Sequence, residues 1–317
     1  MDFLRQNKLW AGSCVLVVVL AGYAFFVTPP RDFPSQAILS IAKGESMSDA
    51  ATSLAEAHVV RSASMLRFIL RLSGGSAHVQ AGTYLFDTRE NVFTIAHRLA
   101  TGAYGLPPVV LSVPEGATVR TIAAKVADVL SPDIANDVVS LGKSQEGYLF
   151  PDTYQLTADA TAESILQMMR ANFDAKTAPL ASEVQASGHA FADLITLASL
   201  VEKEARTEEN RRIVAGVLWN RLARSMPLQV DAVFGYINNR DTYSPSLADL
   251  KIESPYNTYL HTGLPPGPIC NPGLMSILAA LHPTKTDYLY YLTDATGVMH
   301  YATTYAAHQA NEAKYLH

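Results

Sequence analysis

The most distinctive pattern of apolar and polar positions in the chain lies between Phe191 and Arg206. The spacing of its apolar residues predicts a helix with a wide apolar surface. These residues are Leu194, Ile195, Leu197, Ala198, Leu200 and Val201. Charge begins at Glu202, beside this surface, so we expect its carboxyl to be partly desolvated and its pKa to be raised, as a general acid requires. The alternative is that residues 202–204 are only the solvated end of a core helix.

A second apolar segment, from Trp10 to Val27, contains no charged residue and is long enough to cross the hydrocarbon core of a bilayer. Arg5 and Lys8 precede it, which favours a cytoplasmic N-terminus and an exported remainder. A cleaved signal peptide is the alternative, but Tyr23–Pro30 lacks the small-x-small pattern of a cleavage site. The sequence therefore predicts a cytoplasmic tail and an uncleaved transmembrane anchor over residues 1–28, with the rest facing the periplasm or the outside.

The first half of the chain contains an internal repeat. Ile38–Ser46 (ILSIAKGES) is echoed 72 residues later by Val110–Thr118 (VLSVPEGAT). Each copy predicts a short strand, a glycine turn and a Ser or Thr cap before an alanine-rich helix. The helix is expected over Met47–Ala57 in the first copy and over Val119–Leu130 in the second.

A second echo, 70 residues apart, pairs Gly82–Phe86 (GTYLF) with Asp152–Leu156 (DTYQL). Each copy is therefore predicted to close with a tyrosine-bearing strand, and the first half to hold two copies of one β-α unit. Gly102–Pro108 is the expected hinge between them. Two copies are too few for a solenoid, and a duplicated packing module that binds no ligand is the alternative.

The second half combines amphipathic helices with polar loops. Arg211–Leu222 and Leu274–Leu281 each predict a helix. The loops between them are crowded with Tyr, Asn, Gln, Asp, Pro and Gly; aromatic rings and planar amides suit sugar rings and hydroxyls, so the pattern favours a polar surface groove. Tyr288–Leu292 and Val298–Ala302 predict a small terminal β-hairpin. The predicted fold class is α+β.

The composition argues against several classes of function. A net charge of −5 and a sequence pI near 6.0 argue against a nucleic-acid-binding protein. Of the two cysteines, Cys14 lies within the apolar N-terminal segment, so we expect no disulfide with Cys270. The nine histidines lack metal-ligand spacing, so we expect no metal site and no cofactor. The sequence shows no motif for a Ser/His/Asp or Cys/His catalytic set, which disfavours a protease.

Eight motifs of the chain follow one another in an order that resembles a known family. They are Glu146–Tyr154 (EGYLFPDTY), Val201–Ala205 (VEKEA), Trp219–Leu222 (WNRL), Leu228–Asp231 (LQVD), Tyr256–Tyr259 (YNTY), Gly263–Pro268 (GLPPGP), Asn271–Gly273 (NPG) and His282–Lys285 (HPTK). In these motifs the chain resembles the YceG-like (MltG) family, and the resemblance extends from the predicted anchor to the final helix.

The resemblance implies an endolytic murein transglycosylase, a single-pass protein of the inner (plasma) membrane that cuts nascent peptidoglycan strands internally. It implies LysM-like modules at residues 36–106 and 107–157, followed by a mostly helical, periplasmic catalytic transglycosylase domain at 158–317. It also implies Glu202, the first Glu of the E-K-E motif, as the catalytic acid. The implied partners are peptidoglycan glycan strands, the plasma membrane and a peptidoglycan synthase on the same membrane face.

The resulting hypothesis for the mechanism uses one carboxyl. Protonated Glu202 donates its proton to the oxygen between MurNAc and GlcNAc, then accepts a proton from the C6 hydroxyl of the same MurNAc. That hydroxyl attacks C1 and leaves a 1,6-anhydroMurNAc end. Glu204 is expected to point elsewhere and to pair with Arg211 or Arg212. The residues predicted to contact sugars are Asn220, Gln229, Asp231, Tyr256, Asn257, Tyr259 and Asn271.

Two rival functions stay open. One is a non-catalytic, membrane-anchored scaffold that grips glycan strands; such a scaffold needs no carboxyl on an apolar face, so the context of Glu202 counts against it. The other is a lysozyme-like muramidase, in which water attacks instead of the C6 hydroxyl. Hydrolases commonly use two carboxylates, and Asp231 is the candidate for the second.

Overall fold

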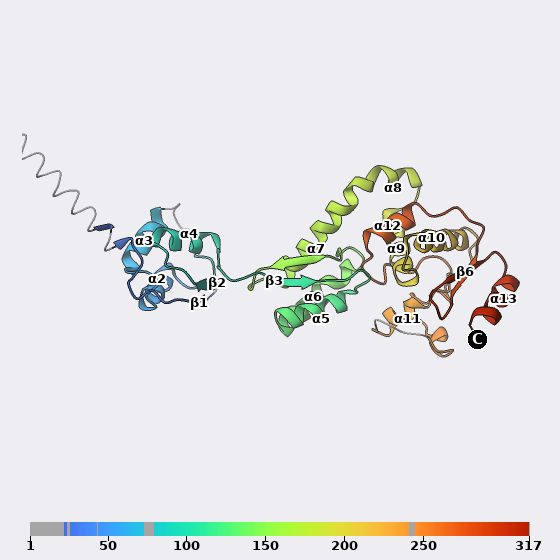
Figure 1. Cartoon of the computed structure of the whole chain (residues 1–317), viewed down its shortest axis with the longest axis horizontal. Helices are drawn as coiled ribbons and strands as arrows, with labels where there is room; N and C mark the ends of the chain where they lie inside the picture. The colour runs from blue at the N-terminus through green and yellow to red at the C-terminus, as the bar shows by residue number, and fades with distance from the viewer. Residues whose placement is uncertain (1–21, 24–25, 43, 73–78, 241–244, 317) are drawn as a thin grey trace, which may run out of the picture. The chain divides into compact units, whose positions relative to one another are not determined.

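The computed structural model describes residues 22–23, 26–42, 44–72, 79–240 and 245–316. The chain divides into two compact units (Figure 1). Unit 1 comprises Met1–Pro108 with Thr157–Asp159, and unit 2 comprises Val109–Leu156 with Ala160–His317. The predicted hinge ends at this boundary. The finer division into a second module and a catalytic domain falls within unit 2.

Unit 1 consists of one antiparallel strand pair and the helices packed on it. Its elements are β1 (Ala37–Ile41), α2 (Met47–Glu56), α3 (Ala63–Leu72), β2 (Gly82–Phe86) and α4 (Val92–Thr101). Strands β1 and β2 pair with each other, and the apolar faces of the three helices enclose a single core. Ser46 and Asn91 cap α2 and α4 through their side chains, as expected for helices that begin after a polar residue.

Unit 2 begins with the same order of elements. They are β3 (Val109–Ser112), α5 (Val119–Val129), α6 (Pro132–Gly142), β4 (Thr153–Leu156) and α7 (Ala162–Thr177), with β3 and β4 antiparallel. A short 3-10 turn, η1 (Lys143–Gln145), follows α6. These elements enclose a second core of their own.

Matching hydrogen bonds show that the two β-α-α-β arrangements are copies. The hydroxyl of Tyr84 in β2 donates to the carbonyl four residues earlier at 2.8 Å, and Tyr154 in β4 does the same at 2.5 Å. The strands also share one register, since Leu39 pairs with Tyr84 and Leu111 with Tyr154. The predicted duplication is confirmed, with one correction: two helices, not one, separate the strands of each copy.

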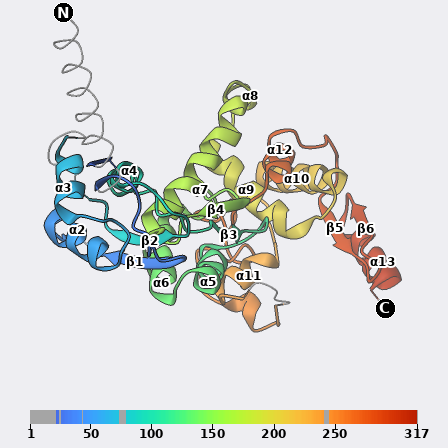
Figure 2. The same ribbon diagram turned by 60° about the vertical axis from the view of Figure 1, so that its left-hand side comes forward.

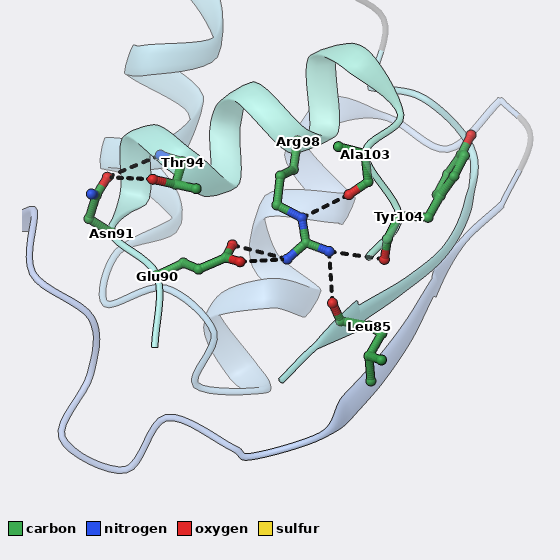
Figure 3. Close-up of polar contacts among 7 residues, drawn as sticks. All are labelled: Leu85, Glu90, Asn91, Thr94, Arg98, Ala103 and Tyr104. Carbon is green, nitrogen blue, oxygen red and sulfur yellow. Dashed lines mark hydrogen bonds and ion pairs between the residues drawn. The ribbon is translucent and has the colours of Figure 1, made fainter. Parts of the chain in front are cut away.

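A buried arginine joins α4 to β2 and to the segment after α4 in unit 1 (Figure 3). Arg98, on α4, is only 7% exposed, and its guanidinium donates two hydrogen bonds of 3.0 Å to Glu90. It also donates to the carbonyls of Leu85, Ala103 and Tyr104, at 2.7 to 2.9 Å. Glu90 balances the charge of the guanidinium, and each of its nitrogens donates to an acceptor. A buried guanidinium is tolerated under these conditions.

This arginine clamp is not part of the repeat. In the second copy the position equivalent to Arg98 is Met168, whose side chain is 40% exposed. Next to the clamp, Gly105 has φ +71°, and a Cβ there would lie 2.3 Å from Nη2 of Arg98. A glycine is therefore required where the chain passes over the guanidinium.

The rest of unit 2 is mainly helical. Its larger elements are α9 (Phe191–Glu204), α10 (Glu208–Ala223), α12 (Leu274–Leu281), the hairpin β5 (Tyr290–Thr293) with β6 (Met299–Ala302), and α13 (Tyr305–Tyr315). Its smaller ones are η2 (Ala178–Leu180), α8 (Ala181–Ser187), α11 (Ala232–Ile237) and η3 (Asp249–Lys251). Helices α9, α10 and α12 pack together, and α13 packs on the hairpin (Figure 2).

The predicted elements of this part are confirmed. Helix α9 follows the predicted apolar pattern, α12 has the predicted bounds, and the terminal hairpin is present. The overall class is mixed α+β, with small antiparallel sheets.

The predicted membrane anchor, Trp10–Val27, lies almost entirely outside the described residues. Within the described ranges, no helix is both long and apolar enough to span a membrane. The anchor therefore stays a prediction from sequence.

Candidate active site

Glu202, the predicted catalytic acid, lies in an internal ion pair. Its side chain is only 5% exposed, and its Oε1 accepts a hydrogen bond from Nη2 of Arg211 at 2.8 Å. Its Oε2 accepts another from the backbone N–H of Gly273 at 2.9 Å. The same Arg211 lies 3.6 Å from Glu115 and donates through Nε to the carbonyl of Ala205. Both oxygens of Glu202 therefore have partners inside the protein.

The prediction that Arg211 or Arg212 pairs with Glu204 is wrong. Arg211 pairs with Glu202, and Arg212 pairs with Glu208 one turn away on its own helix, at 3.1 Å. The reason is the helical period: residues 202 and 204 differ by about 200° around α9. The guanidinium of Arg211 lies on the Glu202 side, so Glu202 faces a positive charge instead of an apolar surface alone.

Glu204 lies in a different environment. Its carboxyl is part-buried, and Oε2 accepts a hydrogen bond from the hydroxyl of Tyr291 at 3.0 Å. Burial and, to a smaller extent, the nearby Asp231 carboxylate raise the pKa of Glu204 to about 7, opposed in part by the bond from Tyr291. A carboxyl with this pKa is protonated in a large fraction of molecules at neutral pH, which is what a general acid needs.

Asp231 and Tyr259 complete this set of residues, which we call the Glu204 cluster: Glu204, Asp231, Tyr259 and Tyr291. The hydroxyl of Tyr259 donates to Oδ1 of Asp231 at 2.5 Å. Burial and the two neighbouring carboxylates raise the pKa of Tyr259, so its hydroxyl keeps its proton. The cluster draws its members from the end of α9, the start of α11, the loop after η3 and strand β5.

Gln229 and Arg221 hold the loop that precedes Asp231 in the chain. Gln229 is exposed and has φ +51°, a left-handed conformation that costs energy for a residue other than glycine. Its backbone N–H donates to the carbonyl of Thr258 at 3.1 Å, which helps to hold this conformation. Arg221 is buried and donates to the carbonyls of Leu228 at 2.7 Å and Leu289 at 2.6 Å. These bonds tie the Gln229 loop to the hairpin that carries Tyr291.

Asn257 and Asn271, two of the predicted sugar contacts, are both 0% exposed. The amide of Asn257 donates to two carbonyls of its own loop, and its oxygen accepts from the N–H of Tyr259. The amide of Asn271 accepts from Gly147 and Leu149 and donates to Ala117 and Glu146. Their polar atoms are used inside the fold, so these two predictions are corrected: both asparagines position loops.

The remaining predicted contacts fall in different places. Gln229, Asp231 and Tyr259 lie together at the Glu204 cluster. Asn220 is part-buried, and its amide donates to the carbonyls of Thr286 and Tyr288. Tyr256 lines a cavity beside α11 whose lining includes no member of the Glu204 cluster.

Sequence reasoning missed two features of the site. The first is Tyr291, which lies in the predicted hairpin and is 87 positions from Glu204. The second is Glu146, whose carboxylate accepts from the N–H of Val119 at 3.1 Å and from Asn271 at 2.9 Å. Burial raises the pKa of Glu146 to about 7. Its EGYLFPDTY motif was the only sequence signal for it, and the motif assigns no role.

No metal-binding group is built by the described residues, since no three His, Cys, Asp or Glu side chains are grouped suitably. Cys270 is free and buried, with Sγ 3.3 Å from the carbonyl oxygen of Ser199. Burial raises the pKa of its thiol, which leaves it protonated and unreactive.

Comparison with known proteins identifies the family of this chain. The sequence matches the YceG-like family over residues 39–314, which is most of its length. The chain belongs to the YceG-like family. The resemblance predicted from the motifs is thereby confirmed.

Two relatives of this YceG-like protein share a name. A protein of Bacillus subtilis named endolytic murein transglycosylase is 33% identical over 94% of this chain and 89% of its own length. A Streptococcus pneumoniae protein of the same name is 40% identical over 54% of this chain and 32% of its own length. A crystal structure described as a yceG-like protein of Listeria monocytogenes has a TM-score of 0.58 and 30% identity, over 87% of this chain and 99% of that one.

Proposed function

We propose that this YceG-like protein is an endolytic murein transglycosylase. It cleaves the β-1,4 bond between MurNAc and GlcNAc within nascent glycan strands and leaves 1,6-anhydroMurNAc ends. The observation that carries this proposal is the shared name of relatives, one of which aligns over 94% of the chain. A part-buried carboxyl with a pKa of about 7, that of Glu204 near the exposed Asp231, supports it.

For the catalytic acid, the geometry supports Glu204 over Glu202. The Glu202 carboxylate forms an ion pair with Arg211 and accepts from the N–H of Gly273, whereas the partners of Glu204, the Tyr291 hydroxyl and the N–H of Ala232, carry no charge. Glu204 lies near the exposed Asp231, and its raised pKa keeps the proton that an acid must donate.

The proposed reaction then needs one carboxyl and no water. Glu204 transfers its proton to the glycosidic oxygen as the bond from that oxygen to C1 of MurNAc breaks. The Glu204 carboxylate next takes the proton of the C6 hydroxyl, and the C6 oxygen bonds to C1. The proton returned to Glu204 balances the one donated, and the attacking hydroxyl belongs to the same sugar, which gives it a high effective concentration.

A muramidase is the second candidate, because Asp231 lies close enough to Glu204 to raise its pKa. A second carboxylate of this kind could activate a water molecule or stabilise a charged intermediate. The bond from Tyr259 to Asp231 favours a positioning role, since that bond occupies one of the two carboxylate oxygens.

The rest of the proposal concerns the N-terminal part. We include in it a single-pass anchor at residues 1–28, a periplasmic catalytic domain and LysM-like modules at 36–106 and 107–157. The β-α-α-β order of both copies supports the modules. An enzyme with this layout would act beside a peptidoglycan synthase on the same membrane face.

The test is a digest of purified glycan strands with the wild-type protein, Glu204→Gln and Glu202→Gln, read by mass spectrometry. Wild type is expected to release internal fragments with 1,6-anhydroMurNAc ends. Glu204→Gln should reduce the rate by at least about 100-fold, the typical contribution of a general acid.

Glu202→Gln should keep most of its activity per folded molecule but lose about 2 kcal/mol of stability, because Arg211 is left with a weaker partner. Loss of activity in Glu202→Gln with an unchanged melting temperature would assign the acid to Glu202 instead. Products that carry one additional water would identify a muramidase, and binding without cleavage by the wild type would identify a scaffold.

A further inference from the structure

We propose that a cavity next to α11 binds the anionic stem peptide of peptidoglycan. This inference rests on the proposed function and names a second subsite for its substrate. The cavity has a volume of about 670 Å³ and is lined by the second repeat on one side and by α11 with the Ser254–Tyr256 loop on the other. Its volume lies within the roughly 300–1,000 Å³ typical of ligand pockets.

Positive charge dominates the cavity wall. Arg120 on α5, Lys143 in η1 and Arg240 after α11 line it, and Glu146 is the single acidic residue among the described residues of the lining. The Glu146 oxygens are already engaged by Val119 and Asn271. Arg120 and Lys143 are exposed, and neither forms an ion pair with any residue of the described ranges. A cavity with this balance attracts an anion.

Two tyrosines supply an apolar surface beside these charges. Tyr236 and Tyr256 line the cavity, with ring centroids 5.0 Å apart and planes inclined by 49°. Burial raises the pKa of Tyr236, and Arg120 lies near enough to its hydroxyl to lower that pKa slightly. The positive charge therefore faces the same space as the ring edges. A ligand with both a carboxylate and small apolar groups fits this surface.

The stem peptide has this chemistry. The sugar rings of a glycan strand carry no charge, and the lactyl carboxyl of MurNAc is consumed in its amide bond to the peptide. The carboxylates of the polymer therefore lie on the stems, next to the methyl groups of alanine residues. Arginine and lysine bind carboxylates by charge-assisted hydrogen bonds.

The position of the cavity agrees with a stem attached near the cleaved bond. Helix α11 connects the two sites: Ala232, at its start, donates a backbone hydrogen bond to Glu204, and Tyr236 lines the cavity. Four residues of helix rise span about 6 Å. A strand that crosses the Glu204 cluster can therefore extend a stem into the cavity.

The test compares kinetics on two substrates: strands that bear stem peptides, and the same strands stripped by an amidase, which removes the peptides and leaves one lactyl carboxylate on each MurNAc. Full-length wild type, Arg120→Gln/Lys143→Gln and a matched control, Arg224→Gln/Lys251→Gln, are assayed on both. The control removes the same charge from exposed positions outside the cavity.

Wild type is expected to have a KM for stem-bearing strands at least about tenfold lower than for stripped strands. The Arg120→Gln/Lys143→Gln protein should lose this preference through KM, with kcat unchanged, and the control should keep it. A tenfold change is the effect of about 1.4 kcal/mol, within the range of one or two charge-assisted bonds.

Equal KM values for both substrates in wild type would overturn the inference and leave the proposed function intact. An equal loss of activity on both substrates in the cavity variant would also overturn it. No cleavage of either substrate by wild type would instead count against the proposed function.

Calorimetric titration measures binding without cleavage. Full-length Glu204→Gln is titrated with a disaccharide-tetrapeptide and with the peptide-free disaccharide. Binding only of the former supports the inference, and equal binding of both, or of neither, overturns it.

Discussion

At the residue scale, Glu202 and Glu204 show how two carboxyls in one motif reach different chemical states. They are two positions apart on α9, so they point to opposite sides of the helix. Arg211 and Gly273 hold the carboxylate of Glu202. Glu204 meets the hydroxyl of Tyr291 and lies near Asp231, and its pKa is raised to about 7. The ion pair with Arg211 is therefore consistent with a structural role for Glu202, and desolvation of the Glu204 carboxyl is consistent with proton transfer.

The assignment of Glu204 as the proposed acid predicts how activity depends on pH. Because the acid must carry its proton, kcat/KM should fall as the pH rises through about 7. The Tyr291 hydroxyl favours the ionised carboxylate, so Tyr291→Phe should raise the pKa of Glu204 and move this alkaline limb to higher pH by up to about one unit. Tyr301→Phe is the control, since Tyr301 donates to Asn210 elsewhere. A limb that stays in place or moves to lower pH contradicts this assignment.

At the scale of elements, the two β-α-α-β copies share strand register and tyrosine hydrogen bonds but differ in how they are closed. The first copy has the buried Arg98 clamp, which joins α4 to β2 and to the segment after α4. The second copy has the exposed Met168 in the same position. Instead, its β4 segment is tied to α7 by Asn172, which donates to Asp152 and Tyr154.

Arg98→Lys should destabilise unit 1 by about 2–4 kcal/mol. Lysine supplies one compact charge in place of the planar fork, so Glu90 and several of the carbonyls of Leu85, Ala103 and Tyr104 lose their donors. Hydrogen exchange read by mass spectrometry should show faster exchange across β2 and α4. Arg67→Lys, on the exposed face of α3, is the matched control and should change little. Unchanged exchange in Arg98→Lys would show that the clamp contributes no stability.

At the scale of unit 2, one asparagine joins the second repeat to the helical part. Asn271 lies just before α12, and its side chain contacts the loops at Ala117 and at Gly147–Leu149. Its backbone N–H and carbonyl also bond to Ala117 and Gly116. The walls of the cavity beside α11 come from these same two parts, so their packing defines the space available to a ligand.

Asn271→Ala should cost unit 2 about 2–4 kcal/mol, because the N–H groups of Gly147 and Leu149 remain buried without an acceptor. Urea denaturation of the full-length protein measures this loss. Asn136→Ala, on the exposed face of α6, should stay within about 0.5 kcal/mol of wild type. A similar midpoint for both variants would mean that Asn271 does not hold the two parts together.

Much of the architecture was predictable because it depends on short-range patterns. The apolar spacing of α9, the Ser and Thr caps and the echoed tyrosine strands each act within a few residues. The helices α3 and α6 were not predicted, because the echoed residues lie in the strands and in the helices before and after them. The polar loops indicated Gln229, Asp231 and Tyr259, which lie near Glu204 or beside Asp231 in the chain, and equally indicated the buried Asn257 and Asn271, since an asparagine that holds a loop and one that binds a sugar look alike in sequence.

The sequence by itself determined the family, the duplication, the terminal hairpin and the motif that holds both candidate carboxyls. Only the tertiary structure distinguishes the environments of Glu202 and Glu204, because these depend on Arg211, Tyr291 and Asp231, which reach α9 from separate elements. Desolvation and ion pairing act over a few ångströms of space, whatever the separation along the chain. For the same reason the cationic cavity, which combines α5, η1 and α11, has no sequence pattern of its own.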